Sequence, residues 1–347
     1  MGTVRKLPSG KYEGAVCCKG RRKSKTFTSK KDARRWCALA EDELERQGHV
    51  SQKTLLEAIE EYRTEVVSKQ RGSANGNWGL TALEQYPIVR KRLCDLRRED
   101  AADFITQRSG KTHLGRPVKT STVIREFARL RAVICWAWRS KGYLDNNPFA
   151  GVALPKPPEH RERTATEEEL EVLCRTVGWD GKSMPDTVRQ RIVAAFLLSC
   201  ETGMRAGEIM AIEPSWLSES GMVVKLPATV TKTQSARQVP LSSRAREILS
   251  LVMQLGLQPT VFSLNYTTAR VIWTRIRNAA GLGEVRDKEG NLIKESLHFH
   301  DGRATFATNV AKKIGPLDLA RVTGHKDLKM LMRYYRPSAE EIAERLE

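Results

Sequence analysis

A proline-dense, charged segment near the middle of the chain constrains the fold more than any other feature. Residues 154–164 include Pro155, Pro157 and Pro158 beside charged side chains. Proline density combined with charge is typical of a semi-stiff interdomain linker. We therefore expect separate domains before and after this segment. The length of 347 residues allows two or three domains that each bury a core.

The charge balance predicts a polyanionic partner. Lysine and arginine number 59 against 41 acidic residues, which gives a formal net charge of +18. Such an excess attracts nucleic acid most often, with an anionic membrane surface as the other candidate. No apolar run approaches the roughly 20 residues that a bilayer span needs, and the polar N-terminus has no signal-peptide character. We therefore expect a cytoplasmic, DNA-associated protein with no membrane partner.

Neither a disulfide framework nor a metal site is predicted. The seven cysteines are scattered, form no CxxC pair and are odd in number. No cysteine–histidine spacing typical of zinc occurs. The acidic run Glu167 to Glu169 is better explained by Thr166, because Thr-x-x-Glu is typical of a capping box that starts a helix.

The first 35 residues are the most basic stretch, with twelve lysines and arginines and only two acidic residues. Turn-forming residues at 8–10 and 19–20 separate short extended segments, and Ser29 can cap a helix over residues 30–47. We expect a small three-stranded sheet with one helix over residues 1–48. A solvated charged face is the alternative, but clustering on one short sheet favours contact with DNA.

Residues 52–153 are expected to be all-helical. Helices are predicted over residues 80–93, 98–107 and 120–139, with a glycine-containing loop over 72–76. The helix 120–139 has one apolar stripe, the pattern of an amphipathic helix that faces a core. Trp136 and Trp138 on this helix are more typical of core anchors than of base-stacking residues.

The part from residue 165 onward is expected to be mixed. Strands are predicted over 222–230 and 237–241 around a turn at 232–235. Helices are predicted over 186–200, 205–212, 243–254, 266–279, 301–313, 317–322 and 327–334, with a short acidic helix over 338–347.

The chemistry-bearing side chains concentrate in this mixed part. Tyr334 follows His300, Arg303 and His325, and Arg205 lies far upstream. The planar fork of arginine matches two oxygens of a phosphate. Donors fixed where charge develops are each worth about 10²–10³ in rate. A free tyrosine has a pKa of about 10, so a tyrosine nucleophile needs a base to take its proton. The set predicts an enzyme that attacks a nucleic-acid backbone and becomes attached to it.

Four motifs that carry these side chains resemble those of the tyrosine recombinases, the phage-integrase family. They are the first arginine box over 202–209, the hairpin lysine at Thr231-Lys232-Thr233, the His-x-x-Arg box over 300–303, and Gly324-His325-Lys326 with Tyr334 nine residues after the histidine. Each motif alone is common by chance. Their occurrence together, in this order and within one domain, makes the resemblance specific.

The resemblance implies a multidomain α+β protein. It implies an arm-type DNA-binding domain over 1–48, a helical core-binding domain over 52–153, the linker over 154–164, and a mostly helical catalytic domain with a small β-sheet over 165–347. The implied partners are double-stranded DNA at core and arm sites and three further copies of the chain in a homotetramer. DNA-bending accessory proteins are an optional addition. No cofactor, metal or ATP is implied.

The resemblance also implies a role for each residue of the site. Tyr334 would attack the phosphodiester to give a 3′-phosphotyrosyl link and a free 5′-hydroxyl. Arg205, Arg303 and His325 would hold the phosphate, His300 would accept the phenol proton, and Lys232 would protonate the leaving oxygen. Strand exchange would then pass through a Holliday junction, which suits an integrase of a phage or other mobile element in a bacterial host cell.

Alternatives exist at several positions. His298 also precedes Arg303, but its spacing favours a structural role and favours His300 as the family's histidine. Tyr335 competes with Tyr334, and the spacing from His325 favours Tyr334. Glu208 is expected to brace Arg205 rather than to catalyse.

Two residues near the second arginine depart from the family pattern. Gly302 and Ala304 stand where leucine and histidine are frequent, which puts local rigidity in question. The rival functions are a non-catalytic DNA-binding regulator on the same fold and a type IB topoisomerase. Invertase and resolvase activity remain open within the family.

Overall fold

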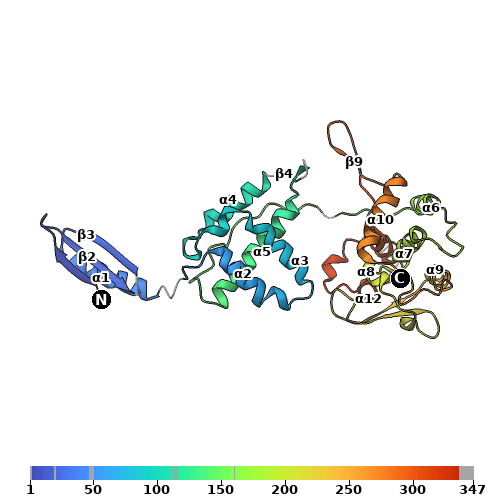
Figure 1. The fold of residues 1–347 in the computed structure, drawn as a ribbon, viewed down its shortest axis with the longest axis horizontal. Coiled ribbons are helices and arrows are strands. Elements are labelled where there is room, and N and C mark those ends of the chain that lie inside the picture. The colour runs from blue at the N-terminus through green and yellow to red at the C-terminus, as the bar shows by residue number, and fades with distance from the viewer. Residues whose placement is uncertain are drawn as a thin grey trace, which may run out of the picture. The chain divides into compact units, whose positions relative to one another are not determined.

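The computed structural model describes residues 2–18, 21–46, 51–110, 112–113, 116–159 and 161–335 (Figure 1). Its contacts divide the chain into two compact units, Met1–His160 and Arg161–Glu347. Among the described residues, no helix combines the length and apolar character needed to cross a membrane.

The N-terminal segment folds as the predicted three strands and one helix. Strands β1 (Thr3–Lys6), β2 (Tyr12–Cys18) and β3 (Arg21–Phe27) form an antiparallel sheet in that order, and α1 (Lys30–Arg46) covers it. The buried contacts between sheet and helix come from Val16, Cys37 and Ala40. A side chain at Gly14 would meet the Cys37 sulfur at 2.9 Å, so this glycine allows the helix to approach β2 closely. The turn predicted at 19–20 lies outside the described residues.

The second segment of this unit is a helical cluster around α5 (Thr120–Arg139), whose bounds match the predicted amphipathic helix. The other elements are α2 (Leu55–Glu65), α3 (Ser73–Glu84), α4 (Arg98–Ser109) and the 3₁₀ helices η1 (Val67–Lys69), η2 (Pro87–Arg90) and η3 (Leu93–Asp95). Phe127, Leu130 and Ile134 of α5 are fully buried in its core. Trp136 and Trp138 pack against this core, in agreement with their predicted role as anchors.

Three predictions for this segment were wrong. Most of the expected loop over 72–76 is helical, because α3 begins at Ser73 directly after the left-handed Gly72. Gly76 and Gly79 allow close packing of this helix, since a side chain there would meet Val67 at 2.7 Å and Arg129 at 2.4 Å. The expected helix over 80–93 stops at Glu84, and Pro87 begins a 3₁₀ helix instead. The segment is also not all-helical, since strands β4 (Thr112–His113) and β5 (Arg116–Pro117) pair as a short hairpin.

The unit Arg161–Glu347 is built around α7 (Val188–Thr202). Its side chains from Ile192 to Cys200 are all buried, as expected for a helix that is apolar on every side. The surrounding helices are α6 (Glu167–Thr176), α8 (Ala206–Met210), α9 (Ser243–Met253), α10 (Tyr266–Ala279), α11 (Asp301–Ala311) and α12 (Pro316–Thr323). The predicted capping box is present, with the Glu169 amide donating to the Thr166 hydroxyl at 3.4 Å.

A two-stranded sheet forms in the predicted region, although its first strand is shorter than the predicted 222–230. Strands β6 (Val223–Leu226) and β7 (Arg237–Pro240) are antiparallel, with Val224 opposite Val239. Both valines are fully buried, whereas Lys225 and Gln238 point outward. The fold class predicted from the sequence is thus confirmed: a mostly helical unit with a small sheet.

Two local predictions for this unit were wrong. The expected helix over 327–334 is reduced to the 3₁₀ helix η5 (Leu328–Met330), which the Asp327 side chain caps by accepting from the Lys329 amide at 2.9 Å. A hairpin of β8 (Val285–Arg286) and β9 (Leu292–Lys294) was not predicted and projects beyond α10 in Figure 1. The helix predicted over 338–347 lies outside the described residues.

The start of this unit is attached to its body. The Arg161 guanidinium pairs with Asp301 at 2.7 Å, and that of Arg163 pairs with Glu169 at 2.7 Å. The Ala165 amide donates to the Thr305 hydroxyl at 2.8 Å. These contacts fix the end of the proline-rich segment beside the first turn of α11.

Candidate active site

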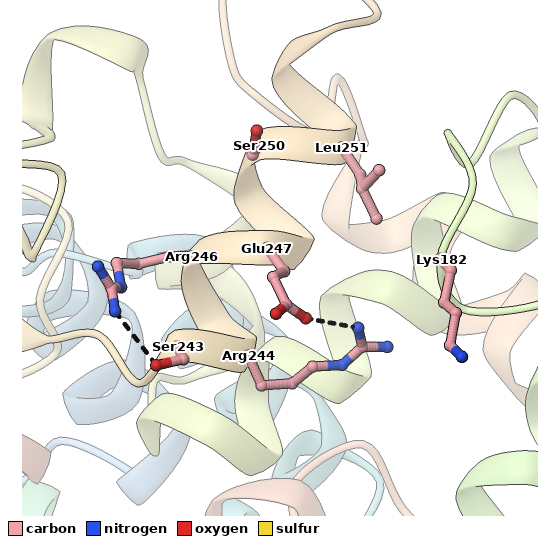
Figure 2. Close-up of a pocket in the computed structure, with 7 residues that line it drawn as sticks. All are labelled: Lys182, Ser243, Arg244, Arg246, Glu247, Ser250 and Leu251. Atoms are coloured by element: carbon pink, nitrogen blue, oxygen red, sulfur yellow. Dashed lines mark hydrogen bonds and ion pairs between the residues drawn. The ribbon is translucent and has the colours of Figure 1, made fainter.

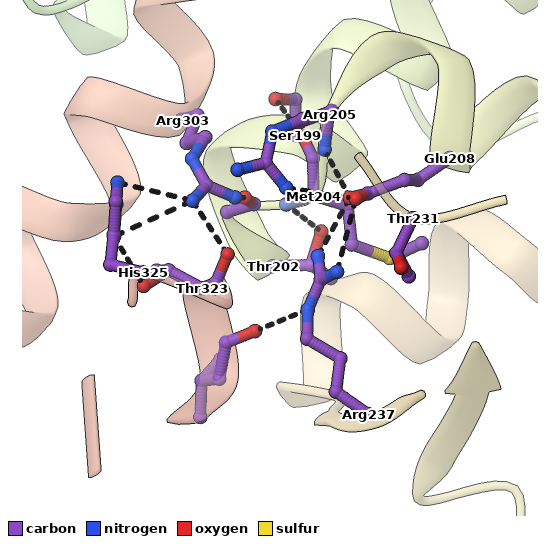
Figure 3. Close-up of polar contacts among 12 residues, drawn as sticks. Ser199, Thr202, Met204, Arg205, Glu208, Thr231, Arg237, Arg303, Thr323 and His325 are labelled. Carbon is purple, nitrogen blue, oxygen red and sulfur yellow. Dashed lines mark hydrogen bonds and ion pairs between the residues drawn. The ribbon is translucent and has the colours of Figure 1, made fainter. Parts of the chain in front are cut away.

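A buried guanidinium forms the centre of the site. Arg303, in the first turn of α11, is 3% exposed and donates through Nη1 to the Gly203 carbonyl at 2.7 Å and through Nη2 to the Thr323 carbonyl at 2.5 Å (Figure 3). These carbonyls belong to the C-terminal ends of α7 and α12, where the helix dipole is negative. Two helix ends therefore stabilise the buried cation.

The positive charge of Arg303 survives its burial. Removal from solvent and the positive charge of Arg205 lower the pKa of Arg303 to about 9, so the guanidinium stays charged at neutral pH. Its Nε–H and second Nη1–H are not used by the two carbonyls or by His325. Those hydrogens are available to a phosphate.

Arg205 precedes α8 and shares a carboxylate with a second arginine. Glu208 is 2% exposed and accepts from Arg205 Nη1 at 3.0 Å, and from Arg237 Nη1 at 3.0 Å and Nη2 at 2.6 Å (Figure 3). Burial alone would raise the pKa of Glu208, but the hydrogen bonds from Arg237 and Arg205 outweigh it and the pKa is lowered. The carboxylate is therefore charged and holds both arginines, as the predicted bracing role requires.

Arg237 ties the sheet to the helices of the site. It begins β7, its Nε donates to the Val322 carbonyl of α12 at 3.0 Å, and its Nη atoms bind Glu208. Arg237 was not anticipated from the sequence. The only local signal is its place as the first residue of the strand that follows the lysine turn.

The two histidines predicted for the site both have lowered pKa values. Removal of solvent is the first cause for His325, followed by the charges of Arg303 and Arg205, and its pKa falls to about 4. His300 precedes α11 and part of its surface is exposed. Partial removal of its ring from solvent, followed by the charge of Arg303, lowers its pKa. Both imidazoles are therefore neutral at pH 7, and a neutral imidazole can accept a proton.

Lys232 lies on the exposed turn between β6 and β7. Its charge contributes to the lowered pKa of His300, which places the ammonium within electrostatic range of that ring. The turn is held by Thr231, fully buried, whose hydroxyl accepts from the Ser235 amide at 3.0 Å.

Tyr334 lies in the turn after η5. Its amide donates to the Leu331 carbonyl at 2.9 Å, and its ring packs on a cluster that includes Phe306 and Leu319. Tyr334 is also among the groups that act electrostatically on Arg303. Tyr335 packs on the same cluster. The predicted nucleophile therefore lies within electrostatic range of the central guanidinium.

Mutual electrostatic interactions connect all six predicted site residues: Arg205, Lys232, His300, Arg303, His325 and Tyr334. His298 is held elsewhere, with its ring bonded to the Ser296 hydroxyl at 3.0 Å and its amide to Asp301 at 2.7 Å. Those contacts support the structural role expected for it.

Several pockets lie among the described residues of this unit, and two of them bear on the location of the site. One of about 650 Å³ is bordered by Thr233 and Ser235 of the lysine turn and by His325, so the turn and this histidine border the same pocket. Another of about 720 Å³ lies along α9, where Arg244 pairs with Glu247 (Figure 2). None of the predicted site residues borders the α9 pocket. Among the described residues, no cluster of acidic, histidine or cysteine side chains could hold a metal ion.

Comparisons with known proteins agree with this arrangement. The model of the phage integrase family matches residues 164–341, about half of the chain. A putative integrase/recombinase of Haemophilus influenzae is 30% identical over 328 residues, covering 92% of this chain and 83% of that one.

Solved structures show the same fold. A lambda integrase dimer bound to a core site superposes with a TM-score of 0.63 at 18% identity, covering 96% of this chain and 94% of that one. A lambda integrase tetramer bound to a Holliday junction gives 0.60 at 18% identity, covering 93% and 95%. The family match, the relative of Haemophilus influenzae and the fold together show that this chain belongs to the phage integrase family of tyrosine recombinases.

Proposed function

We propose that the chain is a site-specific DNA recombinase that integrates or excises a mobile element. The observation that carries this proposal is the convergence of separate segments on Arg303. The ends of α7 and α12 bind its guanidinium, Arg205 and His325 lie beside it, and Tyr334 is close enough to act on its charge. A phosphodiester bound at that guanidinium would lie next to a phenol.

In the proposed cleavage step, the Tyr334 oxygen attacks the phosphorus and the bond to the 5′ oxygen breaks. Charge builds on the non-bridging oxygens, where Arg205 and Arg303 donate hydrogen bonds. The phenol proton goes to His300, which is neutral at pH 7. Lys232, on its exposed turn, gives a proton to the leaving 5′ oxygen.

The product is a 3′-phosphotyrosyl link and a 5′-hydroxyl. The energy of the broken ester is kept in the new one, so religation needs neither ATP nor a metal. The hydroxyl of a second strand reverses the step, and two rounds of exchange pass through a Holliday junction. A homotetramer on DNA is the assembly that this requires, and the likeness of this chain's fold to a lambda integrase tetramer bound to a Holliday junction supports that proposal.

The first prediction is that Tyr334→Phe abolishes cleavage and leaves DNA binding intact. A suicide substrate with a nick near the cleavage site traps the covalent adduct, which is read as a shifted band on a denaturing gel. Tyr335→Phe is the matched control, because the same hydroxyl is removed from the neighbouring ring, and it should still form adduct. Adduct formation by Tyr334→Phe, or its loss in Tyr335→Phe alone, would overturn the assignment.

The same assay separates the rival functions. A non-catalytic regulator on this fold would bind the substrate and form no adduct. A type IB topoisomerase would form adduct and, as a monomer, relax any supercoiled plasmid without exchanging strands. We expect adduct formation together with recombination only between plasmids that carry the cognate site.

A further inference from the structure

The side chain that holds His325 was not anticipated from the sequence. Thr323 is the last residue of α12 and is fully buried. Its hydroxyl lies 2.5 Å from the Leu319 carbonyl and 2.8 Å from His325 Nδ1 (Figure 3). Gly324 lies between Thr323 and His325 and has a left-handed backbone conformation, with φ +70°. The resulting turn places the imidazole next to the end of α12.

The number of hydrogens on each group fixes which atom donates in the two hydrogen bonds of the Thr323 hydroxyl. A hydroxyl has one hydrogen, and the Leu319 carbonyl can only accept it. The Thr323 oxygen therefore acts as an acceptor toward His325, so Nδ1 must carry a hydrogen. The other side of the ring agrees, because Nε2 is 3.2 Å from Arg303 Nη2, a group that can only donate. The longer contact of Nη2, 3.5 Å to Nδ1, is the weaker of the two.

We propose that Thr323 is a positioning residue that fixes His325 in the Nδ1–H tautomer and directs Nε2 to the phosphate site beside Arg303. The positioning role rests on the proposed function, because it concerns the orientation of one group of that active site. The tautomer itself is a property of the protein without DNA.

The Thr323 hydroxyl can accept the Nδ1–H of His325 whether the imidazole is neutral or protonated. In the resting site the neutral imidazole is acted on by three positive groups: Arg303 at the start of α11, Arg205 before α8, and Arg237 on β7. The ring of His300, the other titratable group that acts on it, is itself neutral at pH 7. A bound phosphate offsets these charges and allows Nε2 to gain a proton and donate to it. The Nδ1–H bond to Thr323 is the same in both forms, so the ring gains its donor without moving.

Another threonine at a helix end of this unit makes the same backbone contact as Thr323. Thr176 ends α6 with the same hydroxyl bond to the carbonyl four residues earlier, at 2.7 Å to Val172. No histidine ring is bonded to Thr176 among the described residues. The backbone contact is thus an ordinary helix-end bond, and the contact to His325 is the added feature.

The first test reads the tautomer directly. The full chain, labelled with ¹⁵N-histidine, is measured without DNA at pH 7 by long-range ¹⁵N–¹H correlation, with His325→Gln identifying the signal. We expect His325 to show a protonated Nδ1 in the unmodified chain and in Thr323→Ser, which keeps the hydroxyl. Thr323→Val should shift the pattern toward Nε2–H. A wild-type ring protonated at Nε2, or an unchanged pattern in Thr323→Val, would overturn the proposal.

The second test measures whether the orientation of the His325 ring by Thr323 affects the rate of DNA cleavage. In single-turnover cleavage of the suicide substrate, Thr323→Val should be roughly tenfold slower with unchanged DNA affinity, as expected for loss of one orienting hydrogen bond. Thr323→Ser should be close to wild type. Thr176→Val controls for loss of a helix-end hydroxyl and should cleave normally. In the His325→Gln background, Thr323→Val should add no further loss, and an additive loss would contradict the role.

Failure of the proposed function and failure of the positioning role give different results in these two tests. If the wild-type chain forms no adduct but shows the expected tautomers, the proposed function fails and the positioning of the ring stands. If the chain cleaves DNA but its tautomer ignores Thr323, the positioning role fails and the recombinase assignment stands.

Discussion

At the scale of single residues, the site is an excess of buried positive charge held in place by few anions. Arg205 and Arg237 share the carboxylate of Glu208, while Arg303 relies on carbonyls at two helix ends. Under the proposed function, these cations would be held in place before a phosphate of DNA binds. The same arrangement makes Glu208 costly to remove, since a buried charge without its partner is strongly destabilising.

We therefore predict that Glu208→Gln lowers the free energy of unfolding by about 3 kcal/mol. The amide offers one acceptor and no charge, so it cannot satisfy both guanidinium groups. Urea unfolding of the full chain measures the loss, and cleavage of the suicide substrate should slow with it. Glu247→Gln is the control: Glu247 pairs with Arg244 but is 61% exposed, and an exposed pair contributes less than about 1 kcal/mol. Equal stability of the two variants would contradict the bracing role.

At the scale of elements, the site depends on how closely α11 packs on α7. A side chain at Gly302 would lie 3.1 Å from Phe196 Cε2 and 3.1 Å from both Cβ and Oγ of Ser199. The sequence analysis treated Gly302 as a source of weak local rigidity. The structure gives it another role, because a residue without Cβ lets the helix that carries Arg303 approach the most buried helix of the unit.

It follows that Gly302→Leu, which restores the residue frequent in the family, should destabilise this protein. Forcing a larger side chain into a packed contact costs about 1–3 kcal/mol, and the shift of α11 should also slow cleavage. Thermal unfolding and the cleavage assay measure both effects. The matched control is Gly207→Ala in α8, where nothing lies within 4 Å of an added Cβ, and stability should rise slightly. A Gly302→Leu chain as stable as wild type would show that the helices can separate at no cost.

At the scale of the whole molecule, the N-terminal segment has its own small core of Val16, Cys37 and Ala40, apart from the two larger cores. On the strength of its basic residues and its three-stranded sheet, we propose that this segment binds arm sites and that the rest of the chain binds a separate core site. The domain bounds 1–48, 52–153 and 165–347 belong to that proposal.

The footprint on DNA flanking the recombinase's own gene should therefore have two parts. We predict that a truncated chain of residues 48–347 keeps the inner footprint and loses the outer ones, because only the outer sites need the basic sheet. Nuclease protection at matched protein concentration measures this. A truncated chain with all footprints intact would show that the first segment does not read arm sites, and loss of every footprint would show that it supports binding at the core.

Much of the fold was predictable because the patterns are local. The apolar stripe of α5 gave its bounds correctly, and the capping box at Thr166 gave the start of α6. The failures have a common cause. The glycine-containing segment 72–76 was expected to be a loop and residues 327–334 a helix, but α3 begins at Ser73 and only Leu328–Met330 are helical. The packing of Gly76 close to Val67 and the burial of Leu331 in a cluster with Leu319 depend on residues outside these segments.

By itself, the sequence determined the kinds of groups present and their order along the chain, because phosphate chemistry needs particular side chains and their motifs are short. The motifs identified Arg205, Arg303 and Tyr334 as candidate site residues, although the sequence contains no information on the contacts between them. Only the tertiary structure decided that Glu208 serves two arginines and that Thr323 orients His325. It also decided that Gly302 lets two helices meet. Most of these contacts join residues far apart in the chain, and even the bond from Thr323 to His325 depends on how the end of α12 packs, so no local pattern encodes them.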